Sequence, residues 1–99
     1  MTNDTGLFGL GATEARKLAV WNKGKPIFQN DPSIWRRDDH GNMIRYSDYG
    51  DRNSKYGWEI DHYPLPAALG GSDDLANLRP LHCTANASHG GILGGMLNR

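Results

Sequence analysis

WEIDHYPLPAALGGSDDLANLRPLHCTANASH, residues 58–89, is the stretch that decides the fold. Large apolar side chains alternate as it begins, at Tyr56, Trp58 and Ile60. Alternation with a period of two places these side chains on one face of an extended chain. We therefore predict a strand over residues 56–62 that buries this face.

The remainder of the stretch predicts a loop, a second strand and a helix. Residues 64–74 contain two prolines and a Gly-Gly pair, and so long an irregular loop in a small domain is usually functional. Residues 78–81 are short, apolar and strand-like, and residues 84–88 can begin a helix that Gly90-Gly91 weakens or ends. The expected order is strand, long loop, strand, helix.

Upstream, the pattern predicts one helix and one hairpin. Thr13-Glu14 precedes a helical pattern over residues 15–22, in which Leu18 and Trp21 share the buried face. Gly24 and Pro26 end the helix, and residues 25–30 form a loop or short strand. Residues 34–37 and 43–46 are predicted strands, joined by the turn-rich loop 38–42. We expect a small α+β domain spanning residues 1–99.

Composition excludes several classes of protein. A mean hydropathy of -0.66 and the lack of a long apolar run exclude a membrane span. The single cysteine, Cys83, excludes an internal disulfide and a multi-cysteine zinc site, and we interpret it as a small buried apolar residue. Residues 1–6 lack the features of a signal peptide. A cytoplasmic protein with no membrane partner is the expectation.

The charge is neutral in sum but uneven along the chain. Nine of the 11 basic residues precede Trp58. They could form a basic face that follows nucleic-acid phosphates, although seven acidic residues are interleaved with them and ordinary solvated charges are the alternative. The candidate phosphate contacts are Arg36, Arg37, Arg45 and Arg79.

The polar residues of the deciding stretch suit a one-cation site. Asp61 is a hard oxygen ligand suited to magnesium or manganese, and Asn86 can add a carbonyl oxygen. His62 can accept a proton near neutral pH, and faces the same site only if the strand ends and turns beside it. Asn77 can brace a loop or hold a histidine tautomer. His89 is interpreted equally as a phosphate contact, a metal ligand or a surface histidine.

Other residues have simpler interpretations. His82 is first a packed strand-end histidine and second an additional site residue, and His40 is a solvated turn residue. The three tryptophans are first of all core residues: Trp21, Trp35 and Trp58.

The spacing of Asp61-His62, Gly70-Gly71, Asn77-Leu78, Asn86 and His89 resembles the HNH endonuclease family, and in particular its small stand-alone bacterial or phage-type members. The resemblance implies a ββα-metal core over residues 56–90, preceded by a helix and hairpin extension over residues 12–55. It also implies that His62 is the general base, that Asp61 and Asn86 bind the metal, and that Asn77 orients His62 and the loop.

Some residues depart from the family pattern. Asn86 stands where many members have histidine, which favours Mg²⁺ or Mn²⁺, with Zn²⁺ as the alternative cation. His89 stands where a lysine is common, and the paired CxxC motifs of many relatives are missing.

These features together predict a metal-dependent endonuclease that nicks DNA with low sequence specificity. A homodimer, or two encounters, would be needed to cut both strands. The first alternative is a nucleic-acid-binding module of the same fold with weak or no catalysis. The second is a metal-stabilised structural domain.

Overall fold

The computed structural model describes residues 11–86 and shows within them a helix and two small antiparallel sheets. Residues 83–86 are also helical, and short 3-10 turns are η2 (Tyr46–Asp48), η3 (Ala67–Leu69) and η4 (Leu75–Asn77). The principal elements are α1 (Ala12–Trp21), β1 (Lys25–Pro26), β2 (Trp35–Arg37), β3 (Met43–Arg45), β4 (Trp58–His62) and β5 (Leu78–His82). The α+β class predicted from the sequence is confirmed.

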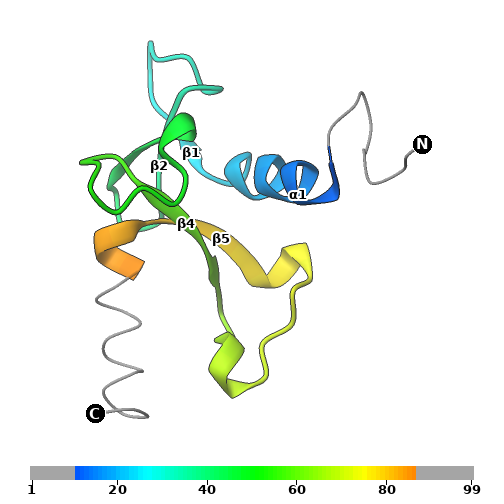
Figure 1. Cartoon of the computed structure of the whole chain (residues 1–99). Helices are drawn as coiled ribbons and strands as arrows, with labels where there is room; N and C mark the ends of the chain where they lie inside the picture. Colours follow the sequence, from blue (N-terminus) through cyan, green and yellow to red (C-terminus); the bar gives the residue numbers. More distant parts are fainter. Residues whose placement is uncertain (1–10, 87–99) are drawn as a thin grey trace.

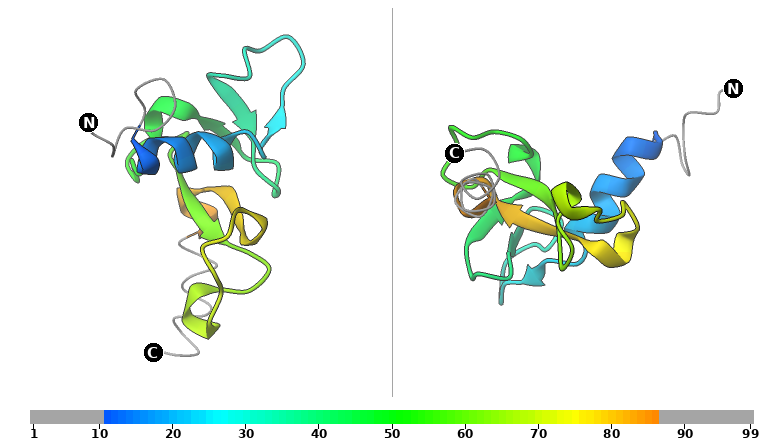
Figure 2. Two further views of the ribbon diagram at one scale, coloured as in Figure 1. Left: turned by 90° about the vertical axis from the view of Figure 1, so that its right-hand side faces the viewer. Right: turned by 90° about the horizontal axis from the view of Figure 1, so that it is seen from below.

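The first sheet has the order β1-β2-β3, and its predicted hairpin is confirmed within one residue at each strand. The second sheet is the β4–β5 hairpin, which pairs Trp58 with His82 at one end and His62 with Leu78 at the other. Figure 1 shows the long β4–β5 connection hanging away from the rest of the molecule. The two views in Figure 2 show α1 beside the end of the hairpin from which this connection leaves.

One apolar core joins the helix to both sheets. It consists of Val20, Trp21, Ile44, Trp58 and Leu78, which come from α1, β3, β4 and β5 and are almost completely inaccessible to solvent. The rings of Trp21 and Trp58 lie 5.1 Å apart. Burial of two tryptophans supplies much of the apolar area that so small a domain can bury.

Two predicted core positions are wrong. Leu18 is 38% exposed, because the buried face of α1 is formed by Val20 and Trp21. This face continues to Lys17, whose ammonium lies above the ring of Tyr46. Leu18 lies to the side of that face. Trp35 is only half-buried, and contacts the ring of Tyr56 edge-on rather than entering the core.

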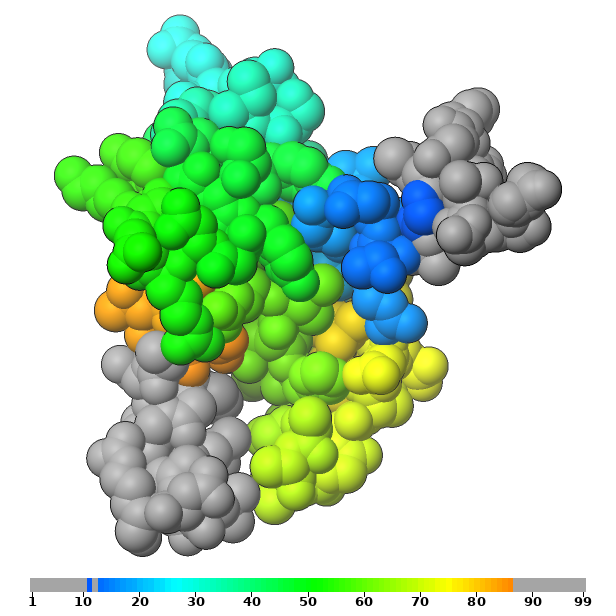
Figure 3. All heavy atoms as spheres, in the orientation of Figure 1, coloured from blue at the N-terminus to red at the C-terminus, as the bar shows by residue number. Residues whose placement is uncertain are grey.

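The helix and the turn that follows it hold the β4–β5 connection. The ammonium of Lys23 donates to the carbonyls of Leu75 and Leu78, and the guanidinium of Arg16 donates to the carbonyl of Asp73 at 2.6 Å. In Figure 3 the yellow segment that contains η4 lies directly beneath the blue helix. No helix in residues 11–86 is long and apolar enough to cross a membrane.

Candidate metal and phosphate site

Strand β4 presents two different faces. Trp58 and Ile60 pack on or against the core, and His62 is on the same side because alternate residues of a strand share a face. Glu59 and Asp61 are on the opposite face. The hairpin therefore separates an apolar side that ends in a histidine from an acidic side.

Asp61 lies in a cluster of charged side chains on the acidic face. It is 7% exposed, and its Oδ2 accepts a hydrogen bond from Nε of its cross-strand partner Arg79 at 2.8 Å. Arg79 also lies 3.4 Å from a carboxylate oxygen of Asp39, and its guanidinium stacks 3.9 Å from the ring centre of Tyr63. Within residues 11–86, Oδ1 of Asp61 has no hydrogen-bond partner, so one carboxylate oxygen is left for a cation.

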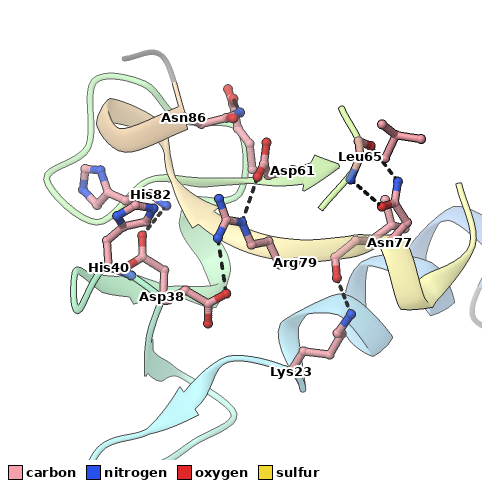
Figure 4. A network of polar contacts seen from close by, with 12 residues as sticks. Lys23, Asp38, His40, Asp61, Leu65, Asn77, Arg79, His82 and Asn86 are labelled. Atoms are coloured by element: carbon pink, nitrogen blue, oxygen red, sulfur yellow. Dashed lines mark hydrogen bonds and ion pairs between the residues drawn. The ribbon is translucent and has the colours of Figure 1, made fainter. Parts of the chain in front are cut away.

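Asn86 lies over the same face. Its Nδ2 donates to Oε1 of Glu59, which lies two residues before Asp61 on β4, at 2.8 Å. Figure 4 shows Asn86 and Asp61 on this side of the hairpin. A carboxylate accepts hydrogen bonds and donates none, so the NH2 end of the Asn86 amide must be the end that faces Glu59. The carbonyl oxygen of Asn86 is therefore the end that remains for a ligand.

Sequence reasoning assigned no role to Glu59. Its carboxylate is held by Arg52 through two hydrogen bonds, from Nε at 2.7 Å and from Nη2 at 2.9 Å. The bonds from Arg52, with a smaller contribution from Asn86, hold the pKa of Glu59 below its ordinary value. Its position two residues before Asp61, on the same strand face, is the signal that could have identified it.

Cys83 is a buried neutral neighbour of this cluster. Burial, and secondarily the charge of Glu59, raises the pKa of its thiol to about 11. Its interpretation as a small buried residue is confirmed, since it is 4% exposed.

His62 is separated from Asp61. The β4–β5 ladder continues in register through both residues, so the chain does not turn between them and their side chains point to opposite faces. Nε2 of His62 lies 2.7 Å from Oδ1 of Asp73 in the connecting loop. That contact lowers the pKa of the exposed Asp73 carboxyl. The structure thus brings Asp61 and Asn86 to one face but leaves His62 on the other.

Asn77 braces the connecting loop. Its Oδ1 accepts from the N–H of Leu65 at 3.0 Å, and its Nδ2 donates to the carbonyls of Leu65 at 2.9 Å and Ser72 at 3.0 Å. The Gly-Gly pair fits the same turn. Gly70 has φ +91°, which favours glycine, and a Cβ on Gly71 would lie 1.8 Å from the carbonyl oxygen of Leu65. No hydrogen bond joins the Asn77 side chain to His62, so it acts directly on the loop alone.

Of the other histidines, His82 is held by hydrogen bonds and His40 is exposed. Nδ1 of His82 accepts from the N–H of Thr84 at 3.0 Å, which leaves Nε2 as the donor to the carbonyl of Lys55 at 2.7 Å. Both ring nitrogens are therefore occupied, as a packed strand-end histidine requires. His40 is exposed, as predicted. His89 and the predicted helix beyond Asn86 lie outside the described residues.

The predicted phosphate contacts differ in how much of each side chain is free. Arg36 donates to three backbone carbonyls, of Asn22, Gly24 and Pro32, at 2.9 to 3.3 Å. Arg45 pairs with Asp48 at 3.0 Å, and Arg79 is 8% exposed. Arg37 is exposed and donates only to the carbonyl of Gly41 at 3.0 Å. Of these four arginines, Arg37 is the most available to a phosphate.

No protein-family model, no curated protein and no solved structure matches the chain. The resemblance to HNH endonucleases therefore stays a prediction. In residues 11–86 no three His, Cys, Asp or Glu side chains converge as a metal site. The predicted ligand pair consists of one carboxylate and one asparagine amide. Such a pair is not a cluster of three His, Cys, Asp or Glu side chains.

Proposed function

We propose that the chain is a metal-dependent endonuclease of the HNH type, with a ββα-metal core, that hydrolyses phosphodiester bonds in DNA. The observation that carries the proposal is the position of Asn86 over the face of β4 that holds Asp61. The strand–loop–strand–helix order of residues 58–86 and the loop brace made by Asn77 support it.

The donor set fits a hard divalent cation. Two side-chain oxygens have no hydrogen-bond partner in residues 11–86 and could bind a cation: Oδ1 of Asp61 and Oδ1 of Asn86. Mg²⁺ and Mn²⁺ prefer oxygen ligands of this kind. When bound, the cation would neutralise charge on the phosphate and on the leaving oxygen. Arg79 balances part of the Asp61 charge, so the cation is held less tightly than by an unpaired carboxylate.

His62 is the proposed general base. If the hydrogen bond to Asp73 is donated by Nε2, the neutral ring keeps Nδ1 as its proton acceptor. A water that gives its proton to Nδ1 would attack the phosphorus, and the bond from phosphorus to the leaving 3′ oxygen would break, with that oxygen taking a proton from solvent. Because His62 and Asp61 lie on opposite faces, the proposal requires the scissile phosphate to sit at the end of β4, where both faces can be reached.

DNA is held through its backbone. Arg37, Lys25 and Lys55 are exposed basic residues, and contacts from such side chains to phosphates carry no direct sequence information. Low sequence specificity and nicking of one strand at a time follow from one site that recognises the backbone.

The test is conversion of supercoiled plasmid to open circle with Mg²⁺, Mn²⁺ or Zn²⁺ as the only divalent cation. We expect nicking with Mg²⁺ and Mn²⁺, weaker nicking with Zn²⁺, and none with Asp61→Ala. Glu14→Ala is the matched control, because this half-exposed carboxylate lies on α1 rather than on the hairpin and should leave nicking unchanged. Activity of Asp61→Ala equal to that of the parent protein would rule out the proposed metal site.

One observation favours a second function, a nucleic-acid-binding module without catalysis. Asp61 and His62 lie on opposite faces, and each is already paired, with Arg79 and Asp73 respectively. A gel-shift assay separates the two functions: a binding module retards DNA equally with and without a divalent cation and never nicks it.

A further inference from the structure

Glu59 lies inside the proposed metal site without a part in the proposed reaction. Its side chain is 20% exposed, and its two carboxylate oxygens are engaged by Arg52 and Asn86. A carboxylate so near a cation-binding pair is either a ligand itself or a group that controls a ligand.

We propose that Glu59 is a positioning residue: clamped by Arg52, it locks the Asn86 amide so that the carbonyl oxygen, and not the NH2 group, is offered to the cation. The inference rests on the proposed function and adds to it the reason why an asparagine can serve as the second ligand.

The need for a lock comes from the shape of the amide. Its oxygen and nitrogen ends are nearly equal in size, and a half-turn of the terminal torsion exchanges them. Only the oxygen end binds a divalent cation, since the NH2 group donates hydrogen bonds and has no lone pair to offer. An unlocked Asn86 would spend part of its time with the wrong end toward the metal.

The geometry of Glu59 supplies this lock. Oε1 accepts from Nδ2 of Asn86 at 2.8 Å and from Nη2 of Arg52 at 2.9 Å, while Oε2 accepts from Nε of Arg52 at 2.7 Å. The guanidinium fork binds both oxygens of the carboxylate and so fixes the orientation of the group. Arg52 thus prevents Glu59 from turning toward the cation and makes it an acceptor for Asn86.

The test is a double-mutant cycle between Glu59 and Asn86, read by calorimetric binding of Mn²⁺ in the absence of DNA. An aspartate at position 86 has two equivalent oxygens and needs no lock. We expect Glu59→Ala to weaken Mn²⁺ binding about tenfold when Asn86 is present, the usual effect of losing a group that orients a ligand. In the Asn86→Asp variant, Glu59→Ala should not weaken Mn²⁺ binding. The aspartate needs no orienting partner, and loss of Glu59 removes the repulsion between two neighbouring carboxylates.

Two further variants separate positioning from charge. Glu14→Ala removes one carboxylate on α1, where Glu14 pairs with Lys17, and should leave Mn²⁺ binding unchanged. Glu59→Gln removes the charge but keeps an oxygen that can accept from Asn86, so binding should stay within about threefold of that of the parent protein. If Glu59→Ala does not fold, Glu59→Gln is the deciding variant. If Glu59 were a direct ligand, or acted only through its charge, this variant would also lose Mn²⁺ affinity.

A metal-free readout accompanies the cycle. The side-chain NH2 resonances of Asn86 in a ¹H–¹⁵N spectrum should move in Glu59→Ala and stay in place in Glu14→Ala.

The outcomes also distinguish this inference from the proposed function. Equal weakening by Glu59→Ala with either residue at position 86, or no weakening with Asn86, would overturn the positioning role even if the parent protein binds Mn²⁺ and nicks DNA. Failure of the parent protein to bind Mn²⁺ would overturn both.

Discussion

The two sheets of this molecule use their polar side chains in different ways. Beside the β1–β2–β3 sheet, the carboxylate of Asp38 is saturated by internal contacts: Asp38 is 1% exposed and accepts from the N–H groups of His40, Asn42 and His82. Along the β4–β5 hairpin, polar groups keep unused capacity, as at Oδ1 of Asp61 and Oδ1 of Asn86.

This difference separates scaffold from site. A buried polar group that has all its partners stabilises the fold and has nothing left for a ligand. A partly buried group with one atom engaged and another free is oriented and still able to bind. We therefore expect replacement of Asp38 to lower stability, and replacement of the half-buried His62 on the hairpin to lower activity with little loss of stability.

The largest expected effect tests the hairpin side of this comparison. Since loss of a general base costs about 10² to 10⁴ in rate, His62→Ala should lower plasmid nicking by that factor. Its side chain is 25% exposed, and its one hydrogen bond goes to exposed Asp73, so the melting temperature should change little. Nicking rates under conditions linear in enzyme, together with thermal unfolding, check both parts.

His40→Ala is the matched control, since His40 is an exposed histidine in the hairpin loop of the first sheet. The base assignment fails if His62→Ala nicks within a few-fold of this control.

The second prediction tests the scaffold side. Asp38→Ala should lower the free energy of unfolding by about 2 to 4 kcal/mol, because several N–H groups lose a buried acceptor. One of these bonds, from the N–H of His82 at 2.9 Å, ties β5 to the loop between β2 and β3. Urea unfolding measures the change.

Asp39→Ala provides the comparison, because its carboxylate is half-exposed and has one contact, to Arg79 at 3.4 Å. Equal destabilisation by the two variants would contradict the scaffold role of Asp38.

Local pattern accounts for most of the fold. Alternation at Trp58 and Ile60 and the turn-rich segment 38–42 were sufficient to predict β4 and the first hairpin. The missed features depend on contacts between residues far apart in the chain. The bond between Asp38 and His82 joins residues 44 positions apart, and no local periodicity encodes such a pair.

For the candidate site, the residue spacing singled out Asp61, Asn77 and Asn86, and their roles in a reaction stay predictions. The structure shows the predicted loop brace by Asn77. The pairing of Asp61 with Arg79 depends on strand register, which a pattern of residues does not specify to one position. The separation of His62 from Asp61 follows from the same register.

The third prediction concerns Asn77, which is polar like Asp38 but belongs to the hairpin. Asn77→Ala should lower stability by about 1 to 2 kcal/mol through its lost hydrogen bonds. Nicking should fall by a larger factor than stability alone explains, because the loop that carries Asp73 loosens beside His62. Parallel urea unfolding and nicking assays measure the two effects.

Asn53→Ala, in an exposed turn, should change neither quantity. A loss of nicking by Asn77→Ala that disappears at lower temperature, where both proteins are fully folded, would assign Asn77 to the scaffold instead.

The smallest expected effect distinguishes two neighbouring arginines. Arg36 holds the chain that follows α1 to β2 through the carbonyls of Asn22 and Gly24, and it also donates to that of Pro32. Arg36→Ala should therefore cost about 1 kcal/mol of stability and leave the salt dependence of DNA binding unchanged. Arg37 is exposed, so Arg37→Ala should leave stability unchanged and weaken binding to unrelated DNA sequences equally.

Each lost phosphate contact lowers the slope of log affinity against log salt by about one. Fluorescence anisotropy between 50 and 200 mM salt measures this slope. For a few phosphate contacts, the affinity should change about tenfold over that range of salt. A flat response in the parent protein, or an unchanged slope for Arg37→Ala, would show that Arg37 makes no contact to a DNA phosphate. Arg37 would then join Arg36 as a side chain without a part in DNA binding.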